Sequence, residues 1–118
     1  MPKAYRIAIL DHDDLMRELT LQWLDDAGHR ASPESIQSLQ GGTVFDLIIL
    51  DLASPRADGV LMRRLRTLHA GPVLLLSARL RRGQSASAHL ARQLGVNVVL
   101  PKPFSRAELM QAIDEVMA

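Results

Sequence analysis

The chain has 118 residues, the size of one ordinary domain, and its 14 Lys and Arg residues nearly balance its 13 Asp and Glu residues. The formal net charge of +1 provides no overall field that would attract nucleic acid or an anionic membrane, and the lack of cysteine excludes disulfides and thiol chemistry. Since no apolar stretch approaches the ~18 residues of a membrane span, we expect a single cytoplasmic domain over residues 1–118 that binds neither nucleic acid nor membrane.

Four short apolar runs are predicted to be strands of a parallel sheet. They are "YRIAIL" at 5–10, "VFDLIIL" at 44–50, "PVLLL" at 72–76 and "NVVL" at 97–100. Each run is too short for a helix and is apolar at successive positions, which is typical of strands covered on both faces. A weaker candidate, "HRAS" at 29–32, is predicted to form an edge strand.

Between these runs, apolar residues recur with helical spacing, which predicts amphipathic helices. The four sets are Leu15, Met16, Leu19 and Trp23; Leu61, Leu65 and Leu68; Leu90 and Leu94; and Leu109, Met110, Ile113 and Met117. Gly28, Gly71 and Gly95 each follow such a stretch, where the end of a helix favours a residue that tolerates positive φ.

The segment after the weak edge strand is predicted to contain a short helix. Its sequence is "PESIQSLQ", with Ser32 as the N-cap and Pro33 at the first helical position. Together with the stronger elements, this segment completes five βα units. The chain is therefore predicted to be an α/β domain with helices on both faces of one parallel sheet.

Polar side chains follow four of the predicted strands: the acidic cluster "DHDD" at 11–14, then Asp51, Ser77 and Lys102. The carboxyl ends of parallel strands open on one rim, so these side chains are expected to lie close together. Singly, each has an ordinary explanation, because acids and serines cap helices and lysines are usually solvated. Together they indicate a functional site. Lys102 is the sharpest signal, since 12 of the 14 basic residues are arginine, although an ordinary surface cation remains the alternative.

Five stretches of the chain resemble the bacterial response-regulator receiver domain over essentially its whole length. They are the acidic cluster after "IAIL", "LIILDL" with Asp51, "PRADG", "VLLLSA" and "PKPF". The resemblance implies a (βα)5 flavodoxin-like three-layer sandwich with strand order 2-1-3-4-5. It also implies a phosphoacceptor of a two-component phosphorelay, not an enzyme, that catalyses only its own phosphorylation and dephosphorylation. The implied partner is a sensor histidine kinase or a phosphotransfer protein, and the implied output is a conformational change or dimerisation through the last two βα units.

The resemblance also assigns roles to individual residues. Asp51 would be the nucleophile that becomes an aspartyl phosphate. Asp11, Asp51 and the carbonyl of Ala53 would hold Mg²⁺, which prefers hard oxygen ligands.

The other phosphoryl-binding groups would come from the last two strands. Ser77, the amide of Ala78 and the ammonium of Lys102 would stabilise charge on the phosphoryl oxygens. The resemblance also implies that the Lys102–Pro103 peptide is cis, which is the minority state of such bonds. Val99 stands where the family commonly has an aromatic residue that moves on phosphorylation, so switching must take another route.

One departure concerns the metal. The family usually has a second acid directly after Asp11, where this chain has His12. Imidazole suits Zn²⁺, Cu²⁺ or Ni²⁺ better than Mg²⁺, so we expect weaker Mg²⁺ binding unless Asp13 or Asp14 supplies the missing oxygen. Mn²⁺ is the alternative ion.

Two other functions stay open at this point. His12 is compatible with a pseudo-receiver that acts as a binding module without phosphorylation. The stretch "ILDHDDL" is also similar to the opening of haloacid dehalogenase-like phosphohydrolases, in which Asp11 would be the nucleophile and Asp13 the acid/base. Those enzymes are usually longer and carry an acidic pair on a late strand, where this chain has "PKPF".

Overall fold

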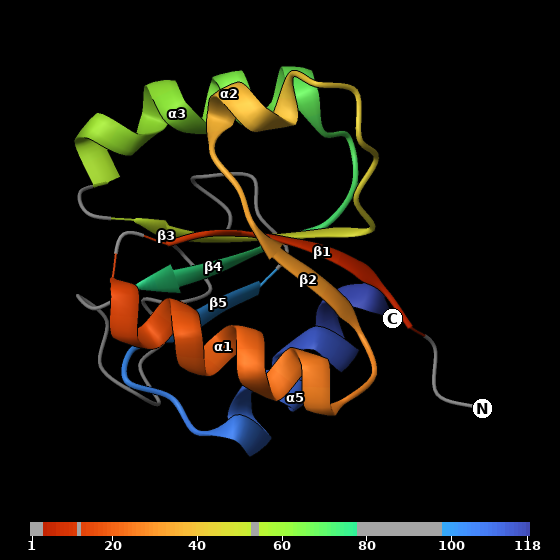
Figure 1. Cartoon of the computed structure of the whole chain (residues 1–118). Helices are drawn as coiled ribbons and strands as arrows, with labels where there is room; N and C mark the ends of the chain where they lie inside the picture. The colour runs from red at the N-terminus through yellow and green to blue at the C-terminus, as the bar shows by residue number, and fades with distance from the viewer. Residues whose placement is uncertain (1–3, 12, 53–54, 78–97) are drawn as a thin grey trace.

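The computed structural model describes residues 4–11, 13–52, 55–77 and 98–118. Five parallel strands form one sheet in the order β2-β1-β3-β4-β5 (Figure 1). Their bounds are Arg6–Leu10 for β1, Arg30–Pro33 for β2, Leu47–Leu52 for β3, Val73–Ser77 for β4 and Val98–Pro101 for β5. The parallel α/β sheet and its strand order are therefore confirmed.

Helices lie on both faces of this sheet, which makes a three-layer sandwich. The described helices are α1 (Asp14–Asp26), α2 (Ile36–Leu39), α3 (Pro55–Leu68) and α5 (Arg106–Met117). Figure 1 shows α1 and α5 on one face and α2 and α3 on the other. The helix predicted around Leu90 and Leu94 lies outside the described residues.

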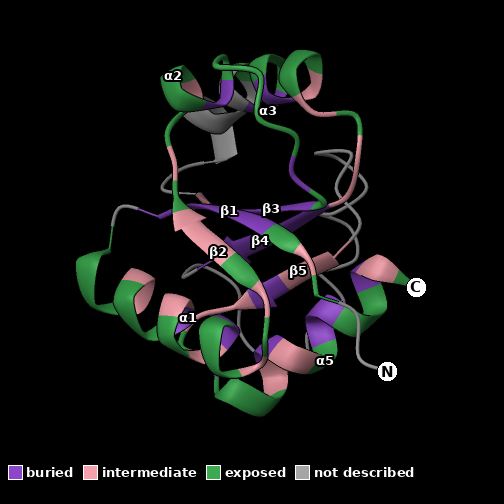
Figure 2. Ribbon diagram, turned by 45° about the vertical axis from the view of Figure 1, so that its right-hand side comes forward, coloured by how far each residue is buried: buried purple, intermediate pink, exposed green. Residues whose placement is uncertain are grey.

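The core consists of two clusters, one on each face of the sheet. Side chains of a strand alternate between the faces, so Ile7 and Ile9 pack in the cluster that contains α1 and α5 residues, and Ala8 and Leu10 pack against α2 and α3. Figure 2 shows that the middle strands are buried, as their continuous apolar runs predict. The run predicted at 44–50 begins too early, because Val44 precedes β3 and is 80% exposed.

The predicted start of the second helix is wrong. Pro33 is the last residue of β2 and pairs with Ile9, whose carbonyl accepts a hydrogen bond from the Glu34 amide at 2.9 Å. The chain leaves the sheet only after this contact, so the N-cap of α2 is Ser35, not Ser32. The Ser35 hydroxyl accepts from the Ser38 amide, and the Ser38 hydroxyl accepts from the Ser35 amide. This reciprocal capping box fixes the short helix.

The buried face of α1 also differs from the prediction. Leu15 is 70% exposed and Leu19 is also exposed, whereas Thr20 and Leu24 are buried. Met16 and Trp23 pack against the core as predicted, but the face they share continues through Thr20. A polar residue at the centre of the buried stripe concealed that face from the hydrophobic pattern.

Two glycines that follow helices behave differently. Gly28 has a φ of 89°, and the amides of Gly28 and His29 donate to the carbonyls of Asp25 and Leu24. This Schellman motif confirms the prediction for Gly28. Gly71 does not have positive φ, because it precedes Pro72 and the residue before a proline prefers extended backbone. Gly95 lies outside the described residues.

Candidate functional site

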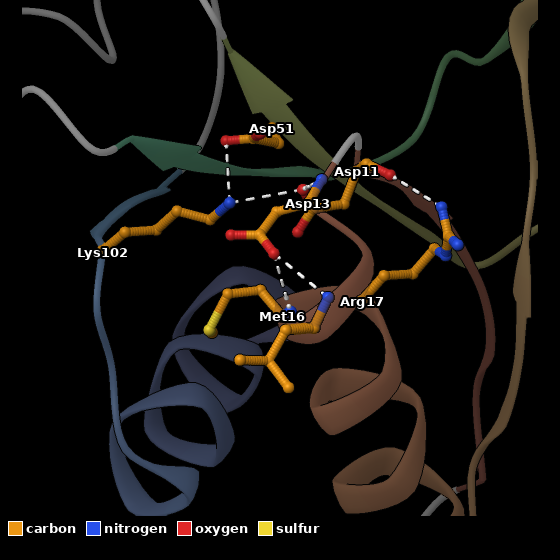
Figure 3. Close-up of polar contacts among 7 residues, drawn as sticks. Asp11, Asp13, Met16, Arg17, Asp51 and Lys102 are labelled. Carbon is orange, nitrogen blue, oxygen red and sulfur yellow. Dashed lines mark hydrogen bonds and ion pairs between the residues drawn. The ribbon is translucent and has the colours of Figure 1, made fainter.

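Three charged side chains meet at the carboxyl ends of the strands. Asp11 follows β1, Asp51 lies in β3 and Lys102 follows β5 (Figure 3). The Lys102 Nζ atom lies 3.3 Å from Asp11 Oδ1 and 3.2 Å from Asp51 Oδ1. A single ammonium therefore bridges two carboxylates that are far from it in the sequence.

The register of the sheet brings these residues together. Leu10 pairs with Leu50, so the residues that follow them, Asp11 after β1 and Asp51 in β3, lie side by side. On the far side of β4, Ser77 pairs with Pro101, and the Lys102 amide donates to the Ser77 carbonyl at 2.8 Å. This last contact holds the backbone of Lys102 at the rim. The Lys102–Pro103 peptide is cis, as expected.

The three charged side chains are largely removed from solvent. The side chain of Asp11 is fully buried, and those of Asp51 and Lys102 are 14% and 10% exposed. Burial raises the pKa of Asp51; Lys102 lowers this pKa and Asp11 raises it. The raised pKa means that Lys102 only partly offsets the cost of holding Asp51 ionised, so the pair of carboxylates favours additional positive charge.

The donor atoms fit a divalent cation. Asp11 Oδ1 accepts from the Asp13 amide at 2.9 Å and from Lys102, whereas Asp11 Oδ2 is buried without a hydrogen-bond partner among the described residues. A buried carboxylate oxygen without a donor is costly unless a cation or water meets it, and Mg²⁺ prefers such oxygens. Within the described ranges, no three His, Cys, Asp or Glu side chains gather as a metal centre. The described donor set therefore consists of Asp11 and Asp51.

The remaining acids of the cluster have other contacts. Asp13 is the N-cap of α1, where its Oδ1 atom accepts from the amides of Leu15 and Met16 at 3.1 and 3.2 Å. Asp14 forms an ion pair with Arg17 at 2.9 Å. The ordinary explanation of a strand-following acid, helix capping, thus holds for Asp13 and not for Asp11.

The other predicted site residues are only partly described. Ser77 is buried at the end of β4, next to the backbone of Lys102. His12, Ala53 and Ala78 lie outside the described residues. The structure therefore brings Asp11, Asp51 and Lys102 together and places Ser77 at the same rim.

Sequence reasoning missed one residue of this rim, Arg17. Its guanidinium donates to the carbonyl oxygen of Asp11 at 3.3 Å (Figure 3). It also donates to Asp14. The three-residue spacing from Asp14 could have predicted the ion pair. The contact with Asp11 depends on the path of the loop, which no spacing rule gives.

The sequence of this chain is similar to those of known proteins. The family model described as the response regulator receiver domain matches residues 7–114. The chain is 34% identical to Protein PetR of Rhodobacter capsulatus over 116 residues, which cover 94% of this chain and 48% of that protein. It is 31% identical to Transcriptional regulatory protein CpxR of Klebsiella pneumoniae over 117 residues, which cover 95% and 49%. The chain thus spans about half the length of these curated relatives.

A solved structure shows the same fold. The receiver domain of sensor histidine kinase PA1611 from Pseudomonas aeruginosa superimposes with a TM-score of 0.76 and 24% identity, covering 98% of both chains. That domain coordinates a magnesium ion in its active-site cleft.

In this chain, no helix of the described residues is long and apolar enough to cross a membrane.

Proposed function

This chain belongs to the response regulator receiver domain family, and from that membership we propose that it is a phosphoacceptor whose phosphorylated residue is Asp51. The observation that carries the proposal is the bridging ammonium of Lys102, 3.2 Å from Asp51 and 3.3 Å from Asp11. At the rim of a parallel sheet, the carboxylate can attack a phosphoryl group, and the cation fixed beside it can neutralise the negative charge that this group brings.

The proposed reaction is a phosphoryl transfer to one oxygen of Asp51. A bond forms between this oxygen and phosphorus, and the bond from phosphorus to the donor's nitrogen or oxygen breaks, with its electron pair leaving on the donor. Lys102 favours the ionised form of Asp51, which burial disfavours. Lys102, Ser77 and the Ala78 amide are proposed to stabilise the phosphoryl oxygens.

The same site is proposed to take a divalent cation. Asp11 and Asp51, with the carbonyl of Ala53, would hold Mg²⁺, which would neutralise charge on the phosphoryl oxygens. Asp11 Oδ2 supports this assignment, because it is buried and meets no donor among the described residues. The magnesium ion of the PA1611 receiver domain, which shares the fold, is consistent with it.

The proposed phosphodonor is a sensor histidine kinase or a phosphotransfer protein, as the family implies. For the output we propose a conformational change or dimerisation through the last two βα units. Val99 is only partly buried and packs against the cluster on the α2 and α3 face. It has no aromatic ring to rotate, so we assign the switch to the loop after β4 or to the dimer.

The proposed function is tested by incubating the purified protein with acetyl phosphate or a phosphoramidate and measuring its intact mass. We expect one added phosphoryl group that is stable in acid and labile in base, as an acyl phosphate is, and that forms only with a divalent cation. A protein that stays unlabelled by either donor, with Mg²⁺ or Mn²⁺, would be a binding module, as His12 and the described donor set of two carboxylates would permit.

His12 offers a specific test of the metal assignment. We expect His12→Asp to bind Mg²⁺ at least tenfold more tightly than wild type and to be phosphorylated faster, because it restores one charge and one hard oxygen. A tenfold gain needs only about 1.4 kcal/mol. Wild type should respond comparatively better to Mn²⁺. Without metal, His12→Asp should melt at a lower temperature, because it adds a fourth acid to the cluster.

Metal titrations followed by tryptophan fluorescence measure these affinities. Trp23, the only tryptophan, lies edge-on to Phe104 with ring centroids 6.2 Å apart, and Phe104 is two residues from Lys102. Trp23 thus packs against the segment that carries Lys102. Equal Mg²⁺ affinity of the two proteins would show that another oxygen, such as one from Asp13 or Asp14, already replaces the missing ligand.

A further inference from the structure

Arg17 contacts both ends of the acidic corner, our name for the acidic cluster at residues 11–14. Its Nη1 atom donates to the carbonyl oxygen of Asp11 at 3.3 Å, and its Nη2 atom donates to Asp14 Oδ1 at 2.9 Å. The side chain is 29% exposed. The guanidinium therefore contacts the main chain at the end of β1 (Figure 3) and, through Asp14, the first turn of α1.

These contacts complete the restraints on Asp11. Its Oδ1 atom is held by the Asp13 amide at 2.9 Å and by Lys102 at 3.3 Å, and its carbonyl oxygen is held by Arg17. Three donors, two from the start of α1 and one from the residue after β5, thus hold both the main chain and the carboxylate of Asp11. Asp11 Oδ2 is the atom left without a donor among the described residues.

We propose that Arg17 is a positioning residue for the metal site: by holding the Asp11 carbonyl, it keeps the Asp11 carboxylate in the orientation that binds a divalent cation beside Asp51. Asp14, whose side chain is 86% exposed, contacts the other side of the guanidinium. The inference rests on the proposed function only in taking Asp11 and Asp51 as metal ligands.

The charge of Arg17 and its hydrogen bond to Asp11 affect metal affinity in opposite directions. A positive charge near two carboxylates repels a second cation, so removing the charge alone would tighten metal binding. Removing the hydrogen bond to the Asp11 carbonyl would loosen it, because groups that orient ligands typically contribute 10–100-fold to metal affinity. Whether metal affinity rises or falls in the Arg17 variants therefore shows whether the charge or the hydrogen bond dominates.

Two substitutions separate these effects. Arg17→Lys keeps the charge but loses the planar fork that reaches two acceptors, and Arg17→Gln loses both. Arg30→Lys is the matched control, because Arg30 is an exposed arginine of β2 far from the acidic corner in sequence. Affinities for Mg²⁺ and Mn²⁺ are measured through Trp23 fluorescence, and melting temperatures are measured without metal.

We expect Arg17→Lys to bind Mg²⁺ about tenfold more weakly than wild type, at the lower end of the range for ligand-orienting groups. Arg17→Gln should also bind more weakly than wild type, but by less, because it removes the charge that repels the ion as well. Their metal-free melting temperatures should fall by only a few degrees, because a partly exposed helical ion pair contributes little to stability. The Arg30→Lys control should bind like wild type. A loss of affinity without a matching loss of stability distinguishes positioning from a general structural role.

Three results would overturn the proposal. The first is that Arg17→Lys binds Mg²⁺ like wild type while Arg17→Gln binds more tightly, which would leave only the charge effect. The second is a loss of affinity no larger than that of Arg30→Lys. The third is a wild type that binds neither Mg²⁺ nor Mn²⁺. Labelling by acetyl phosphate is scored separately: an unlabelled wild type whose metal affinity falls in both variants overturns the phosphoacceptor function and keeps the role of Arg17.

Discussion

Asp51→Asn is expected to incorporate no phosphoryl group from acetyl phosphate, under conditions in which wild type incorporates one. The amide has no anionic oxygen to attack phosphorus, and among the described residues Asp11 is the only other acid that forms an ion pair with Lys102. The measurement is the intact mass of both proteins after equal incubation with the donor and Mg²⁺.

Asp51→Asn should remain folded, so its loss of labelling will not be due to unfolding. The pKa of Asp51 is raised in the folded state, so the folded protein loses stability as pH rises from the ordinary pKa of an aspartate through this raised value. Asp51→Asn lacks that loss and should be at least as stable as wild type at neutral pH. Asp25→Asn, at an exposed position of α1, is the control and should be labelled normally. A labelled Asp51→Asn protein would contradict the assignment.

Lys102→Met is expected to reduce both the rate of phosphorylation and the stability of the fold. The rate should fall by about 10²-fold or more, the usual cost of removing one group that stabilises developing negative charge. The unfolding free energy at pH 8 without metal should fall by about 3 kcal/mol, because Asp11 and Asp51 would face each other without their cation. Chemical denaturation and labelling kinetics measure the two effects.

The stability defect of Lys102→Met should depend on pH in one direction. Lys102 lowers the pKa of Asp51, so its removal raises that pKa further, and protonation then relieves the repulsion as pH falls through the new value. The difference from wild type should shrink between pH 8 and pH 5. Arg106→Met, an exposed cation of α5, should show neither effect. A defect that is the same at both pH values would mean that packing, not charge, causes it.

The central part of the site could be predicted because it depends on topology. Continuous apolar runs indicate parallel strands, and parallel strands place their carboxyl ends on one rim, so Asp11, Asp51 and Lys102 had to converge. Their distances and the restraints on Asp11 depend on the path of the chain after β1. The role of Arg17 therefore became visible only in the structure.

The errors in the fold have a related cause. Pro33 and Ser32 form a good helix start by local rules, but pairing of Pro33 with Ile9 keeps both residues in the strand. In α1, Leu15 and Leu19 look like a core face, whereas the buried face contains Thr20. Local preference and hydrophobic spacing were outweighed in each case by contacts with the sheet, which a single sequence does not display.

The most direct measurement locates the phosphoryl group itself. Borohydride reduces an aspartyl phosphate to homoserine, so the labelled wild-type protein can be reduced, digested and mapped by mass spectrometry. The phosphoacceptor account predicts homoserine at position 51 and aspartate at position 11. Homoserine at position 11, with position 51 unchanged, would contradict it and would instead support a phosphohydrolase in which Asp11 is the nucleophile.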